Sequence, residues 1–189
     1  MKKLLTCILF LFASTALSQT QHLHSGRYSE WRVEILKKAY SASDEHPSHP
    51  DTESLMVVSA IQARDESRQL THSTYYFTEA SRGRLSMSYS TYILLNGDCP
   101  FGKLHVTLSA SGRKHQYPAT CQYRHSKREK SIIVRLDEKD SYLMVSLMKF
   151  LADNAVSDIN ILYNGISESF SLKGADRALD AIIAPMIIR

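Results

Sequence analysis

The sequence predicts an α+β fold dominated by antiparallel β-sheet, either one twisted sheet or a small β-sandwich, with two covering helices near the C-terminus. Three observations predict it. Short segments in which apolar and polar residues alternate recur through most of the chain. Turn sequences that contain glycine separate several of these segments. Two segments with apolar residues three and four positions apart come late in the chain.

Seven or eight strands are expected before the first helix. The segment at residues 55–61 is rich in valine and isoleucine, which is typical of a central strand. In residues 84–95 apolar residues alternate with serines, so the strand has one solvated face and belongs to an antiparallel sheet. The segments with the clearest strand patterns are residues 31–36, 55–61, 71–77, 84–95, 104–108, 117–121 and 132–136.

Short turns set the order of several strands. Turn sequences at residues 96–98 and 111–113 bracket one strand, so the strand that follows should fold back beside it. Asn164-Gly165 connects residues 159–163 to residues 166–172. Asn-Gly favours the two left-handed positions of a type I′ turn, so this pair predicts a hairpin with a fixed register.

Two amphipathic helices are predicted in the last third of the chain. Residues 142–152 form the first, and Asp140 or Ser141 can cap its start. A second helix begins at Gly174 and ends before Pro185. We expect both to cover one face or one end of the sheet. The apolar residues that define the first helix are Leu143, Met144, Leu147, Phe150 and Leu151.

The chain begins with the pattern of a bacterial secretory signal peptide at residues 1–18. A basic start precedes an apolar run, and Ala16 and Ser18 are the small residues of a cleavage site before Gln19. The apolar run is shorter than the about 20 residues of a transmembrane helix, so we expect no membrane span. The sequence therefore predicts export to the periplasm, and leaves secretion or surface association open.

The remaining chain has the size of one domain. Residues 19–29 are polar and are expected to form a flexible N-terminus of the mature chain, and residues 30–189 a single globular domain. The net charge of +4 falls to about +2 once Lys2 and Lys3 are removed. This charge is too small to indicate a nucleic-acid partner.

Cys99 and Cys121 are the only cysteines of the predicted mature chain, because Cys7 lies in the signal peptide. In an oxidising compartment two cysteines most simply form a disulfide. The bridge would close a loop of roughly 20 residues and stabilise the fold by about 3 kcal/mol. A free thiol pair and a metal site are the alternatives, but a metal site needs three or four closely spaced ligands.

Sequence motifs of common enzymes are absent, among them Gly-x-Ser-x-Gly, glycine-rich phosphate loops and His-Glu-x-x-His. We therefore expect no catalytic residue, no metal and no cofactor. His22 with His24, and His46 with His49, have spacings that could hold copper or zinc. Both pairs fall in segments expected to be flexible, where ordering entropy opposes binding. The single histidines on strands, His72, His105 and His115, are expected to be exposed.

A protein-binding surface is the main functional prediction. Several tyrosines lie on predicted strands, and outward-facing tyrosines suit protein recognition. The alternative is that tyrosine simply favours strands. The basic stretch at residues 124–130 is either a solvated hairpin loop or a patch for an anionic ligand. The predicted interaction surface consists of Tyr75, Tyr76, Tyr92, Arg124, Lys127 and Arg128.

Two segments carry a family resemblance. Trp31-Arg32-Val33 opens a strand, and residues 170–180 run from a strand through Ser-Leu-Lys-Gly into an Ala-Leu helix. These segments resemble the two ends of the invasion-associated locus B family of exported bacterial proteins, although the cysteine of the first motif is missing and Ala175 replaces an aromatic residue. The resemblance implies a β-rich periplasmic or surface protein linked to host interaction, without an established catalytic activity.

One short motif favours a different class of protein. Ser25-Gly26-Arg27-Tyr28 resembles the Ser-Gly-x-Tyr loop by which some periplasmic lysozyme inhibitors enter an active site. An inhibitory loop should be held rigidly between strands, whereas this motif precedes the first predicted strand. The sequence thus favours a non-enzymatic exported protein that binds another protein. The alternatives are an inhibitor or immunity protein against a cell-wall enzyme, and a hydrolase with scattered site residues.

The signal-peptide interpretation predicts the mature terminus. Signal peptidases cut after small residues, so exported protein should begin at Gln19 when its intact mass is measured by mass spectrometry. Exported protein that keeps residues 1–18 would contradict this interpretation.

Overall fold

The computed structural model describes residues 20–39, 52–65, 68–79, 84–99, 104–124 and 131–183. The predicted signal peptide and the second histidine pair, His46 and His49, lie outside these residues. In chain order the elements are β1 (Thr20–Tyr28), β2 (Trp31–Ala39), β3 (Thr52–Ala63), β4 (Gln69–Glu79), β5 (Arg84–Asn96), β6 (Leu104–Ala110), β7 (Arg113–Arg124), β8 (Ser131–Leu136), α1 (Glu138–Asp153), β9 (Asp158–Tyr163), β10 (Ile166–Ser171) and α2 (Ala175–Ile183).

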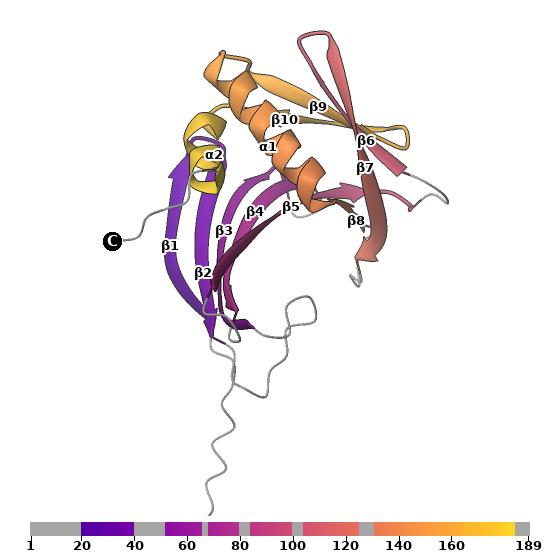
Figure 1. Ribbon diagram of the computed structural model, residues 1–189. Coiled ribbons are helices and arrows are strands. Elements are labelled where there is room, and N and C mark those ends of the chain that lie inside the picture. Colours follow the sequence, from indigo (N-terminus) through magenta and orange to yellow (C-terminus); the bar gives the residue numbers. More distant parts are fainter. Residues whose placement is uncertain are drawn as a thin grey trace, which may run out of the picture.

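All ten described strands belong to one antiparallel sheet with the order β1-β2-β3-β4-β5-β8-β7-β6-β9-β10 (Figure 1). Strands β1 to β5 form a meander in which each strand pairs with the next. Strand β8 lies beside β5, and the sheet then runs back through β7 and β6. A short pairing between β6 and β9 adds the final hairpin. The predicted β-dominated α+β class is confirmed, as a single sheet and not a sandwich.

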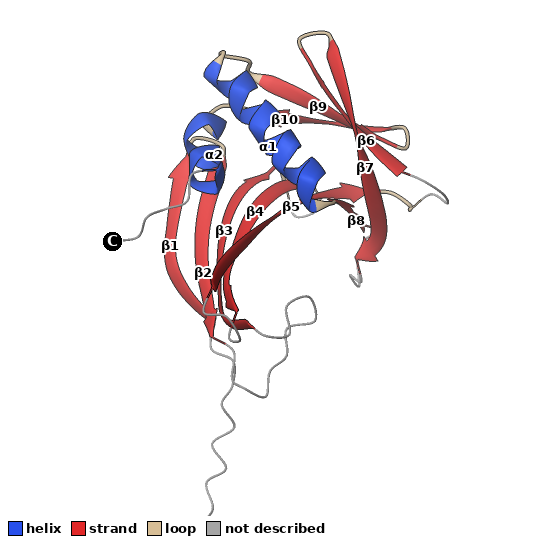
Figure 2. Cartoon of the chain, viewed as in Figure 1, coloured by secondary structure: helices blue, strands red, loops and turns tan. Residues whose placement is uncertain are grey.

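The sheet is strongly curved, and both helices lie on its inner side (Figure 2). Successive side chains of a strand point to opposite faces, so along the central strands every second residue points to the inner side of the sheet. These inner residues and the buried faces of the helices form one apolar core. Burial of this surface is the main stabilising contribution to the fold. The helical residues that fill the core are Met144, Val145, Met148, Ala178, Leu179 and Ile182.

The predicted hairpin turn has the expected backbone. Asn164 and Gly165 have φ values of 46° and 79°, and both are positive, as a type I′ turn requires. The register of β9 and β10 continues from this turn, with Ile166 opposite Tyr163. Ser111 and Gly112 also have positive φ values and join β6 to β7.

Two elements differ from the sequence prediction. Residues 20–28, expected to be flexible, form the edge strand β1, which pairs with β2 at eight positions. Backbone hydrogen bonds to β2 can hold a strand of polar residues at a sheet edge. Helix α1 begins at Glu138, earlier than predicted, and its N-cap is Asp137, whose side chain accepts a hydrogen bond from Asp140 N at 2.8 Å. The polar first turn carries no apolar periodicity, so the pattern did not reveal it.

The two far ends of the sheet meet at a set of contacts that we call the edge junction, formed by Tyr28, Trp31, Ser171 and Gly174. Trp31 is fully buried, and its Nε1 donates a hydrogen bond to Ser171 O at 2.9 Å. Gly174, just before α2, approaches the β1–β2 turn so closely that an added Cβ would lie 2.2 Å from Tyr28 O. Side-chain and turn contacts therefore join β2 to the end of β10 without strand pairing.

Buried hydrogen bonds attach both helices to the sheet. The pairing of β5 with β8 ends at Tyr92, and the next amide, Thr91 N, donates to Ser141 Oγ of α1 at 2.8 Å. Thr74 Oγ1 donates to Ile182 O in the last turn of α2 at 2.8 Å. Both bonds satisfy backbone groups at positions where a strand pairing or a helix ends.

His72 is fully buried, so the prediction that it is exposed was wrong. Its Nδ1 lies 2.8 Å from Thr91 Oγ1, its Nε2 lies 3.2 Å from Met148 Sδ, and its ring stacks on Trp31 at a centroid distance of 6.1 Å. Burial lowers the pKa of His72 to about 3, so the ring is neutral at physiological pH. The two other single strand histidines, His105 and His115, are exposed as predicted.

Cys99 and Cys121 lie at disulfide distance, with 2.00 Å between the sulfur atoms and 5.7 Å between the Cα atoms. Cys99 follows β5 and Cys121 lies in β7. Strand β8 lies between these two strands in the sheet, so the bridge joins the segment that follows β5 directly to β7. This pairing is the one that the sequence predicts.

Substitution Gly174→Ala should destabilise the fold by at least about 2 kcal/mol, because the new Cβ would overlap Tyr28 O and the φ of +87° disfavours alanine. Gly112→Ala is the matched control, since Gly112 has a φ of +76° and open space around it. The control should lose only about 1 kcal/mol from backbone strain. Urea unfolding measures both losses, and equal losses would show that the contact with Tyr28 is unimportant.

Stability should fall as the pH drops below 6.5. The unfolded His72 takes up a proton near its ordinary pKa of 6.5, whereas the folded pKa of about 3 keeps the buried ring neutral. The free energy of unfolding should therefore decrease by about 1.4 kcal/mol per pH unit between these two values. Urea unfolding from about pH 7.5 to about pH 4.5 measures this slope. His72→Gln should reduce the slope and the exposed His105→Gln should not; identical slopes would contradict the assignment.

Candidate functional site

The alternation of side chains along β4 separates the predicted tyrosines. Tyr76 is 7% exposed and belongs to the core beneath the helices. Tyr75 therefore faces the outer surface of the sheet. Tyr92 on β5 faces the same way, since its neighbour Ile93 lies in the core. The structure thus places Tyr75 and Tyr92 on one face and Tyr76 on the other.

A hollow of about 350 Å³, which we call the outer hollow, opens on this face over β4, β5 and β8. The strand register builds it. Gln69, Leu94 and Ile133 lie directly opposite one another, and Tyr92 and Arg135 form the next row. Gln69 Nε2 donates to Tyr92 Oη at 3.4 Å, so the polar rim is connected. The hollow therefore combines an apolar floor with a phenol, an amide and a guanidinium group.

Charge and hydrogen-bonding capacity at the outer hollow are set by Arg135 and Tyr92, and Tyr75 lies close to both on the same face without lining the hollow. Burial raises the pKa of Tyr75, the nearby Tyr92 adds to the rise, and Arg135 opposes it. The Tyr75 phenol thus stays protonated at physiological pH and can donate a hydrogen bond. Arg135 is exposed and carries a planar cation that can bind a carboxylate through two parallel hydrogen bonds or stack on an aromatic ring.

The basic part of the predicted surface is only partly described. Arg124 ends β7 opposite Ser131, whereas Arg135 pairs with Thr120 at the other end of β8. Lys127 and Arg128 lie outside the described residues. Arg135 and Gln69 were missed by the sequence prediction, because only the strand register reveals that they share a face with Tyr92.

The residues of the predicted inhibitor loop lie in a strand. Ser25, Gly26 and Tyr28 belong to β1, and they pair with Glu34, Val33 and Trp31 of β2. Backbone pairing with β2 makes this segment an extended edge and not a loop that could enter an active site. The structure therefore differs from the loop geometry that the motif implied.

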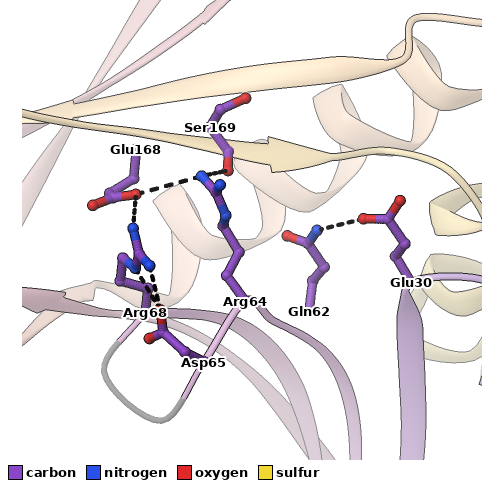
Figure 3. Close-up of polar contacts among 7 residues, drawn as sticks. All are labelled: Glu30, Gln62, Arg64, Asp65, Arg68, Glu168 and Ser169. Carbon is purple, nitrogen blue, oxygen red and sulfur yellow. Dashed lines mark hydrogen bonds and ion pairs between the residues drawn. The ribbon is translucent and has the colours of Figure 1, made fainter.

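A charged cluster links the β3–β4 turn to β10 (Figure 3). Arg64 Nη1 donates to Ser169 O at 3.2 Å and lies 3.7 Å from Glu168 Oε2. Arg68 forms an ion pair with Asp65, and its Nη1 is also 3.7 Å from Glu168 Oε2. The hydrogen bond to Asp65 raises the pKa of Arg68. These contacts occupy the outer edge of β10 and protect it from pairing with another chain.

Beside this cluster, Gln62 has a buried amide whose oxygen is unsatisfied. Gln62 is 3% exposed, and its Nε2 donates to Glu30 Oε2 at 3.4 Å. Its Oε1 has no hydrogen-bond partner in the part of the chain that the structure describes. A second hollow of about 210 Å³, which we call the junction hollow, opens here. It is lined by Glu30, Gln62, Arg64, Asp158, Ser169 and Ser171.

Helix α1 exposes large apolar residues on its outer side. Leu143 is 46% exposed and Phe150 is 61% exposed, although both belong to the predicted apolar stripe of this helix. Ser141, Met144 and Met148 fill the inner face instead. The apolar residues of α1 exceed what one buried face can hold, so the periodicity alone did not identify the buried side.

Within residues 20–183, where described, no group of three or more histidine, cysteine, aspartate or glutamate side chains is placed to hold a metal ion. The two described helices do not reach the length and apolar character that membrane crossing requires. No protein-family model matches the chain, and no curated protein or solved structure shows significant similarity to it.

Proposed function

We propose that this protein is an exported binding protein of the bacterial periplasm or cell surface, which recognises another protein through the outer face of its sheet. The observation that supports this proposal most directly is the outer hollow, about 350 Å³ in volume, with Tyr92 and Arg135 on its rim. The predicted signal peptide and the resemblance to the invasion-associated locus B family support the exported, host-related part of the proposal.

The chemistry of the outer hollow suits an anchor side chain from a partner protein. Tyrosine and arginine are the residue types that most often dominate binding energy at protein interfaces. Leu94 and Ile133 supply an apolar floor, and the exposed Arg135 supplies a positive charge. We therefore propose that the partner presents an aromatic or carboxylate side chain. Because the rim residues lie on paired strands, little conformational entropy would be lost on binding.

Site-specific photo-crosslinking in the exporting bacterium, or with its host cells, tests this proposal. Replacing Tyr92 by p-benzoylphenylalanine places the reactive group in the outer hollow. We expect a discrete crosslinked product of higher mass. The same residue at Tyr123, which is 52% exposed on β7 but does not line the hollow, should give no such product.

A charge reversal tests whether the partner is recognised by the site. Arg135→Glu should reduce the yield from position 92 at least about tenfold, the effect expected for a contact residue at an interface. Arg113→Glu, an equal change at the exposed β6–β7 turn, should leave the yield unchanged. Equal yields in both variants would contradict the proposal. Lysozyme inhibition by purified protein that survives Arg135→Glu would favour the inhibitor alternative.

A further inference from the structure

We propose that the junction hollow binds a protonated amine, held by the amide oxygen of Gln62 and the carboxylates of Glu30 and Asp158. This inference does not rest on the proposed protein-binding face, because the junction hollow and the outer hollow share no lining residue. A failure of either proposal therefore leaves the other standing.

The buried amide of Gln62 provides the first argument. Its Oε1 is an acceptor without a partner among the described residues, while its Nε2 faces Glu30 Oε2 (Figure 3). Rotating the amide would place Oε1 against the Glu30 carboxylate, so two acceptors would meet and the unsatisfied oxygen would not be relieved. A buried acceptor left without a donor destabilises a protein. This oxygen has almost no accessible surface in the free protein, so a ligand N–H group would satisfy it by entering beside the amide.

The charges around the junction hollow provide the second argument. Glu30 and Asp158 both line it, and both are exposed. Arg64, the only cation among its described lining residues, donates to Ser169 O and lies beside Glu168. The carbonyl of Ser171 already receives the indole N–H of Trp31. The amide oxygen of Gln62 and the two carboxylates can still accept hydrogen bonds from a ligand, and together they favour a cationic donor.

The position of the junction hollow suggests what binding would do to the fold. Glu30 and Gln62 lie at the β1–β2 turn and the end of β3, whereas Asp158 begins β9 and Ser169 lies in β10. A ligand held by both groups would connect the two far ends of the sheet. A ligand that binds only the folded state raises stability as its concentration exceeds the dissociation constant, so thermal unfolding reports binding.

Calorimetric titration and thermal unfolding with two amine probes test the proposal. Nα-acetyl-lysine methylamide represents a lysine side chain of a polypeptide, and glucosamine represents a free small amine. Their neutral counterparts are Nα-acetyl-norleucine methylamide and N-acetylglucosamine. We expect at least one amine to bind saturably and to raise the melting temperature, while its neutral counterpart does neither. Binding of the lysine probe alone assigns the site to a protein side chain, and binding of glucosamine assigns it to a free amine.

Gln62→Leu distinguishes a ligand site from a structural role. Removal of the unsatisfied oxygen should leave the melting temperature of the free protein unchanged or higher, yet weaken amine binding at least about tenfold. Glu30→Gln and Asp158→Asn change exposed side chains, so both variants should fold even if Gln62→Leu does not. Both should also weaken amine binding. Glu138→Gln, which removes an exposed carboxylate on α1, should not.

Three results would overturn the proposal. They are absence of amine binding at concentrations up to about 10 mM, equal binding of the neutral probes, and unchanged affinity in Gln62→Leu together with the two carboxylate variants. In the first case the hollow holds only water. The outer-face crosslink would be unaffected by any of these results.

Discussion

The indole N–H of Trp31 donates to Ser171 O, and this contact is the centre of the edge junction. It connects residues 140 positions apart, at the start of β2 and the end of β10. Around it, Trp31 stacks on His72, and Gly174 packs against the Tyr28 carbonyl. These contacts join the far ends of the curved sheet, where described strands do not pair, and α1 and α2 lie on its inner side.

The same curvature separates two kinds of surface. The inner face is filled by helices and by apolar side chains, and its Thr74 hydroxyl is hydrogen-bonded to Ile182 O. The outer face is left without helices, and Tyr92 and Arg135 border a hollow there. Where the ends of the sheet approach, unlike charges from distant segments meet, as Arg64 meets Glu168. Candidate sites therefore occur on the outer face and at the ends, away from the core.

Local patterns in the sequence predict much of this fold and little of its sites. The Asn164-Gly165 turn and the two late helices follow from spacings of a few residues, and the structure has them. Strand β1 was missed because a polar edge strand is held by backbone bonds to its neighbour. The burial of His72, the row that joins Tyr92 to Arg135, and the meeting of Gln62 with Glu30 depend on which strands become neighbours. No short-range pattern contains that information.

The order of synthesis places the formation of the edge junction late in folding, after strands β1 to β5 have been made. Strands β1 to β5 pair with sequence neighbours, so they can associate early and quickly. Ser171 and α2 follow α1 in the chain, and until they arrive Trp31 lacks its acceptor and the inner surface that α2 covers stays open. Closure of such distant contacts is slow, and intermediates with uncovered apolar surface aggregate or are degraded. The time at which Ser171 and α2 reach the sheet therefore determines how long strands β1 to β5 are exposed to aggregation and degradation.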